Sequence, residues 1–170
     1  MTDDLHPVIA ASTRWLLAAY PASGGALGRA LAEAQARQAV TLAAALRYPA
    51  DMDVALLHLL APGGSDRLDR VSGGEPHHEG GAWRTWVDEA VVSWAACFLA
   101  DPALAAHAVS RAETAHGHRT ARDLRRLTAP GTRDTEAAAL LRHPDLLENI
   151  AGLHRPQLLE LLSADTADRP

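Results

Sequence analysis

Apolar residues recur along most of the chain at spacings of three and four residues, which is typical of α-helices with one buried face. Proline, glycine and aspartate residues interrupt the pattern and set the ends of the expected helices. The pattern predicts helices over residues 7–20, 26–47, 51–60, 83–99 and 102–127, with short helices near 134–142, 144–153 and 156–163. It indicates an all-α, single-domain helical bundle of about six to eight helices spanning residues 1–170.

The segment 83–99 has the most regular amphipathic pattern in the chain. One side of the expected helix carries the row Trp83, Val87, Trp94 and Phe98, and Ser93 lies off that side. Trp83 and Trp86 are about 60° apart around a helix axis. We therefore expect one of the two tryptophans to stay near the surface, where an indole is a good anchor for a partner protein.

Residues 61–82 interrupt the helical pattern. This stretch holds six of the 12 glycines and two prolines. Such a composition is typical of a loop, and the sequence predicts a flexible Gly/Pro-rich loop inside the domain, with a short turn at Asp66–Val71 as an option.

The composition supports helices over strands. The chain holds 36 Ala and 25 Leu but only 8 Val and 2 Ile. Ala and Leu lose little side-chain freedom in a helix, whereas the β-branched residues lose more. An internal echo, AAALRYP at 43–49 and AALLRHP at 138–144, resembles the helical hairpins of irregular HEAT-like repeats, without their constant spacing.

Charge and targeting patterns narrow the classes of function. All 16 positive charges are Arg, which excludes mechanisms that need Lys, such as Schiff-base chemistry or a P-loop nucleotide site. The net charge of −5 disfavours nucleic acid as a partner. The chain has no basic, apolar leader and no apolar run of the ~20 residues that a membrane span needs, which predicts a cytoplasmic protein without membrane contact.

Cysteine and histidine usage shows no metal or redox motif. The single cysteine, Cys97, lies in an apolar run, so no intrachain disulfide can form and a buried thiol is expected. The nine histidines lack HExxH spacing, and the chain has no paired CxxC motif. The sequence therefore predicts neither a cofactor nor a metal-ligand set.

Two segments resemble the HD-type metal phosphohydrolases. These are DVALLHLL at 53–60 and LLRHPDLLENI at 140–150. The resemblance implies that His58 is the motif histidine and that Asp145, followed by Asn149, is the later aspartate. Leu59 stands where the family has its metal-binding aspartate, so the resemblance implies a diverged hydrolase with an impaired metal centre.

The spacing Arg111-x4-His116 resembles that of HEPN ribonucleases, which are small all-α proteins. The resemblance implies that Arg111 holds a phosphate and that His116 assists attack by a 2′-hydroxyl, with no metal required. Residues five apart on a straight helix differ by about 140°, so the pair shares a face only if the helix bends, which Gly117 would permit. The polar residue that usually follows the arginine is replaced by Ala112.

A basic run follows in the same expected helix. It consists of Arg119, Arg122, Arg125 and Arg126, which the spacing places on one face. This is either a solvated face or a surface for an anion or an acidic partner. The candidate partner-binding residues are Trp83, Trp86, Arg119, Arg122 and Arg126.

The sequence as a whole favours a non-catalytic helical module for protein–protein interaction or an adaptor, with self-association as an option. No complete catalytic constellation is present, whereas residues 83–98 are rich in aromatic side chains and the C-terminal part is rich in Leu. The ribonuclease, the hydrolase and a small-molecule binder with a pocket near the tryptophans stay open as alternatives.

Overall fold

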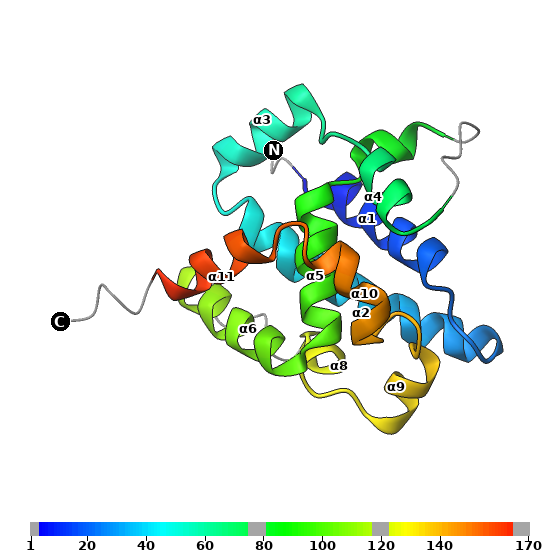
Figure 1. The fold of residues 1–170 in the computed structure, drawn as a ribbon. Helices are drawn as coiled ribbons and strands as arrows, with labels where there is room; N and C mark the ends of the chain where they lie inside the picture. The colour runs from blue at the N-terminus through cyan, green and yellow to red at the C-terminus, as the bar shows by residue number, and fades with distance from the viewer. Residues whose placement is uncertain (1–3, 75–80, 117–122, 165–170) are drawn as a thin grey trace.

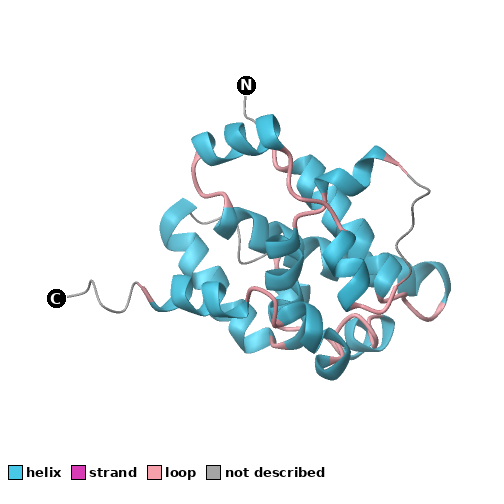
Figure 2. Cartoon of the chain, turned by 45° about the horizontal axis from the view of Figure 1, so that its top comes forward, coloured by secondary structure: helices cyan, strands magenta, loops and turns pink. Residues whose placement is uncertain are grey.

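The computed structural model describes residues 4–74, 81–116 and 123–164. Within these ranges the chain forms helices and connecting loops and contains no strand (Figures 1 and 2). The elements are α1 (His6–Ala19), α2 (Gly25–Arg47), α3 (Asp51–Leu60), α4 (Asp66–Val71), the 3₁₀-helix η1 (Ala82–Trp86), α5 (Glu89–Ala100), α6 (Pro102–His116), α8 (Arg125–Thr128), α9 (Thr132–Ala137), α10 (Pro144–Ala151) and α11 (Arg155–Ser163). The predicted all-α fold is confirmed, but the described ranges hold 10 α-helices rather than six to eight. The excess consists of helices of one or two turns, which are too short to show periodicity.

Helix α5 forms the centre of the molecule, with the other helices around it (Figure 1). Its residues from Val91 to Leu99 are all buried, including the hydroxyl of Ser93 and the thiol of Cys97. Ser93, which the sequence places off the apolar side, is thus buried as well, because neighbouring helices cover α5 on every side. The prediction that Cys97 is buried is confirmed, and burial raises the pKa of its thiol.

Helix α5 begins at Glu89 rather than at the predicted residue 83. Asp88 is its N-cap, and Asp88 Oδ1 accepts a hydrogen bond from the Val91 N–H at 3.1 Å. The preceding residues form the separate helix η1. Trp83 and Trp86 therefore do not share a helix with Phe98.

Helix α6 starts as the sequence predicts but ends earlier. Asp101 Oδ1 accepts from the N–H groups of Ala103 and Leu104 at 3.0 and 3.1 Å, and Pro102 occupies the first turn. The helix ends at His116. Residues 125–128 belong to the separate short helix α8, so the predicted single helix over 102–127 is wrong.

Part of the predicted flexible loop is ordered helix. Asp66–Val71 forms α4, whose Leu68 and Asp69 are buried. The short turn that the sequence allows at these residues is in fact a helix, and Leu68 packs it against the core. Residues 75–80 lie outside the described ranges.

The internal echo does not mark a repeated unit. Residues 43–47 end the long helix α2, whereas residues 138–142 form turns between α9 and α10. The predicted helix over 134–142 likewise ends at Ala137. Among the described helices, none is both long and apolar enough to cross a membrane.

Candidate functional site

Trp83 and Trp86 attach η1 to two different helices. The Trp83 ring is close to two guanidinium groups, with Cζ of Arg14 at 4.4 Å and Cζ of Arg84 at 5.0 Å from the ring centroid. The Trp86 ring lies 5.4 Å from the ring of His58, tilted by 56°. Both indoles are half-buried, so both keep some surface exposed to solvent.

Asp69 in α4 is the centre of a polar cluster that holds η1 against α1. Its Oδ1 accepts a hydrogen bond from Trp15 Nε1 at 2.7 Å. Its Oδ2 accepts from Arg84 Nη1 at 3.0 Å and from Ser65 Oγ at 3.2 Å. Because this buried carboxylate already has three side-chain donors, the cluster serves to fix α1, α4 and η1 together.

The two residues of the HD-type resemblance lie on different helices, His58 on α3 and Asp145 on α10, and both are exposed. His58 Nε2 lies 2.7 Å from the backbone oxygen of Asp4, within hydrogen-bond distance. In the part of the chain that the structure describes, no three His, Cys, Asp or Glu side chains gather as a metal site would require.

The pair of the HEPN resemblance lies on α6. Arg111 is half-buried within the helix, and His116 is its last residue. Since α6 continues to His116, the two positions differ by about 140° around the axis. The side chain of His116, and all of Arg119 and Arg122, lie outside the part of the structure that is described.

The rest of the basic run lies in α8, beside a pocket of about 470 Å³. Arg126 Nη1 donates to Asp134 Oδ1 at 2.6 Å, so its charge is paired within the chain. The lining residues are Gln38, Arg125, Arg126, Ala129, Gly131 and Asp134. The carboxylate in this wall offsets part of the positive charge that the sequence suggests.

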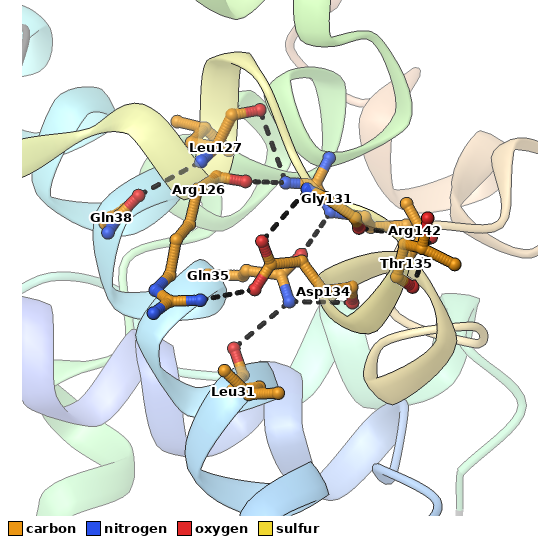
Figure 3. A network of polar contacts seen from close by, with 10 residues as sticks. Leu31, Gln35, Gln38, Arg126, Leu127, Gly131, Asp134, Thr135 and Arg142 are labelled. Carbon is orange, nitrogen blue, oxygen red and sulfur yellow. Dashed lines mark hydrogen bonds and ion pairs between the residues drawn. The ribbon is translucent and has the colours of Figure 1, made fainter.

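Arg142 is the hub of the polar network drawn in Figure 3. Its side chain is only 9% exposed, and its Nε donates to Gln35 Oε1. Its Nη2 donates to the carbonyl oxygens of Arg126 at 2.8 Å and Leu127 at 3.3 Å, and its Nη1 donates to that of Leu99 at 3.3 Å. One guanidinium thus joins α2, α5 and α8 through neutral oxygen atoms.

The same network includes Asp134 of α9 (Figure 3). Burial would raise the pKa of the Asp134 carboxyl, but the Gly131 N–H at 3.0 Å and the Arg126 guanidinium outweigh burial and hold this pKa below its usual range. Gln35 Nε2 donates to the Asp134 carbonyl at 2.8 Å. All of these contacts join residues of the chain itself, so the network holds α2, α8 and α9 together.

The polar network around Arg142 is not apparent from the sequence. Arg142 stands in a run of Ala and Leu, and its position near the end of an apolar segment gives no sign of burial. Gln35 is a buried polar residue of α2 that needs a partner, but its burial is known only from the structure.

Helix α3 exposes a row of apolar side chains. Met52, Leu56, Leu59 and Leu60 are 75%, 50%, 80% and 79% exposed. Their spacing of four, three and one places them on one side of the helix, which we call the α3 face. Val54 and Leu57 point the other way and are buried.

A groove adjoins the α3 face. It has a volume of about 320 Å³ and lies between the end of α2 and α3. Its lining residues are Arg47, Tyr48, Asp53, Leu56, Leu57, Leu60, Ala61 and Pro62. The groove widens the apolar area, since most of its lining is apolar.

The α3 face is not apparent from the sequence. Apolar residues occur on both sides of this helix, so periodicity does not tell which side the fold covers. The pair of adjacent leucines at the C-terminal end, Leu59 and Leu60, is the one sequence feature that could have suggested excess apolar surface.

No family model, curated protein or solved structure matches this chain.

Proposed function

We propose that the protein is a non-catalytic helical module that binds another protein through the α3 face. One observation carries the proposal: four large apolar side chains lie in a row, each at least half exposed. By their exposed fractions they present on the order of 500 Å² of apolar surface, which is in the upper part of the range for the largest apolar patch of a monomer, a patch that is often functional.

The α3 face is not needed to attach α3 to the rest of the fold. Val54 and Leu57 anchor the helix from its other side. The capping contact at its start is also complete, because Asp53 Oδ2 accepts from the Ala50 N–H at 3.2 Å. Binding of a partner over the exposed row would therefore be favourable, because it removes this apolar surface from water.

The polar clusters support a non-catalytic role. The carboxylates of Asp69, Asp88 and Asp134 each hold backbone or side-chain donors of the chain itself. Arg142 likewise bonds only to acceptors of the fold. Groups with such full sets of partners maintain the fold rather than act on a substrate.

Trp86 contacts α3 but lies outside the α3 face. Of the partner-binding residues predicted from the sequence, Trp86 is in contact with α3, through the ring of His58. His58 lies at least about 100° around the helix axis from every residue of the exposed row, so Trp86 packs beside α3 outside the α3 face. Arg126 is engaged with Asp134 on α8 and has no place in this surface.

Site-specific photo-cross-linking in the cells that make the protein tests the proposal. A photoreactive residue replaces Leu59 on the α3 face, and in a matched control it replaces Leu27, which is 64% exposed on α2. We expect a protein adduct from position 59 and none from position 27. The purified adduct partner should bind the wild-type chain and lose about tenfold or more in affinity with Leu59→Glu but not with Leu27→Glu.

Two results would overturn the proposal. One is the absence of an adduct at position 59 in cells that express the protein. The other is equal cross-linking at positions 59 and 27, which would reflect random collisions rather than a binding face.

A further inference from the structure

We propose that the occupant of the α3 face is a second copy of this chain, paired antiparallel about a two-fold axis at Leu56. The inference rests on the proposed function, because it requires that the α3 face binds a protein. It goes further by naming the partner, the orientation of the two helices and their register.

The spacing of the row fits a copy of itself. Met52 and Leu60 are each four residues from Leu56, so they lie about 6 Å from it in opposite directions along the axis. When two copies run antiparallel about Leu56, Leu56 meets its own copy and Met52 meets Leu60 of the second chain. A two-fold interface needs this kind of self-complementary patch.

Charge favours the antiparallel orientation. The row itself carries no charged side chain. Asp51 and Asp53 lie in the first turn of α3. A parallel pair would bring these carboxylates of the two copies together, whereas an antiparallel pair keeps them at opposite ends. The antiparallel pair also aligns the two helix dipoles in opposite directions, which is favourable.

The position of α3 allows two copies to meet. The helix lies at the edge of the molecule, away from the central α5 (Figure 1). Met52, Leu59 and Leu60 are the most exposed large hydrophobic residues in the described structure, and Leu56 follows them after Leu27. A second copy can therefore reach the row without displacing another element.

The small buried area is typical of a reversible contact. Two α3 faces together bury on the order of 1,000 Å², which is near the lower limit for a specific interface. The groove beside Tyr48 and Pro62 borders this contact, with Arg47 and Asp53 in its lining. We therefore expect a reversible dimer that dissociates on dilution through the micromolar range.

Sedimentation velocity over a dilution series measures the pairing. We expect the wild-type chain and Leu27→Glu to shift from dimer to monomer on dilution. Leu59→Glu should raise the apparent Kd by about tenfold or more, because the symmetry places the new charge in the interface twice. Circular dichroism checks that each variant is folded, as the 80% exposure of Leu59 leads us to expect.

Disulfide trapping tests the register. Cys97 is buried, so a new exposed cysteine is the reactive one. Leu56→Cys should form a covalent dimer under mild oxidation, and the matched Leu27→Cys should not. A mixture of Met52→Cys and Leu60→Cys chains should cross-link to each other faster than either cross-links to itself.

The outcomes separate this inference from the proposed function. A wild-type chain that stays monomeric at all concentrations overturns the dimer, and an adduct with a different protein at position 59 would then leave the proposed function standing. Self-linking of Met52→Cys that outpaces the mixed pair overturns the antiparallel register. A dimer that Leu59→Glu does not weaken overturns both the inference and the role of the α3 face.

Discussion

Arg142 shows how a single side chain can hold several elements together. A buried guanidinium has five N–H donors, and here carbonyl and amide oxygens from α2, α5 and α8 accept from it. Burial lowers the pKa of Arg142, and the nearby Asp134 counteracts this shift. The side chain stays charged, because the pKa of Arg lies far above neutrality.

Replacing Arg142 should destabilise the fold strongly. In Arg142→Met the acceptors on Gln35, Leu99 and Arg126 lose their donor inside the protein. We expect a loss of about 3–5 kcal/mol in the free energy of unfolding, measured by urea denaturation. The control Arg37→Ala, which removes a surface pair with Glu33, should change stability by less than about 0.5 kcal/mol. A loss below about 1 kcal/mol in Arg142→Met would mean that water replaces the guanidinium.

Asp134 should make stability depend on acid pH. The pKa of its carboxyl is lower in the folded chain than in the unfolded chain. The carboxylate's contribution is therefore complete above the unfolded-state pKa of about 3.9 and is lost as the pH falls through the lower folded-state pKa. Asp134→Asn lacks this contribution at every pH, so its difference from wild type should shrink as the pH falls below about 4.

Unfolding free energies measured between neutral and acid pH check this expectation. Asp145→Asn, which changes an exposed carboxyl on α10, controls for the loss of one negative charge. A wild-type to Asp134→Asn difference that stays constant down to strong acid would contradict the role of the Gly131 and Arg126 contacts.

At the scale of elements, the sequence predicts helices best where a capping signal and the periodicity agree. The bounds of α3 match the predicted 51–60, and Asp101-Pro102 marks the start of α6. The start of α5 is predicted wrongly because Trp83 continues the apolar period through Val87. The capping aspartate Asp88 inside the predicted helix is the signal that decides the true start.

The candidate site is less predictable than the helices. The bounds of α3 follow from its own residues, whereas the exposure of Leu59 and Leu60 depends on which side the remaining helices cover. Val54 and Leu57 are as apolar as the exposed row, so only the tertiary packing distinguishes the two sides. Burial of Arg142 is likewise set by the way α2, α5 and α8 meet.

The cap of α5 should matter more than the cap of α6. Asp88 is buried, caps the helix with Oδ1 and accepts from the Tyr48 hydroxyl with Oδ2. Asp88→Ala should cost about 2–3 kcal/mol of unfolding free energy, because a cap and the partner of a half-buried hydroxyl are lost together. Asp101→Ala removes an exposed cap and should cost about 1 kcal/mol. Equal losses in urea denaturation would show that the bond to Tyr48 adds nothing.

At the scale of the whole molecule, the stability of the single chain and its association through the α3 face should depend on different residues. One core cluster includes side chains from Val8 in α1 to Leu162 in α11, and the exposed row of α3 lies outside it. The row therefore contributes little to the stability of a single chain. A partner that binds only the folded chain adds stability in proportion to its concentration relative to Kd.

Thermal unfolding as a function of protein concentration measures this separation. At dilutions where the chain is monomeric, Leu59→Glu should unfold at the wild-type midpoint, because the substituted side chain is 80% exposed. At concentrations well above Kd the wild-type midpoint should rise and that of Leu59→Glu should not, since only the wild type gains the stabilisation of the dimer. Leu27→Glu should follow the wild type throughout. A lower midpoint of Leu59→Glu at high dilution would show instead that the α3 face supports the fold of the single chain, and the exposed row would then have no separate role in binding.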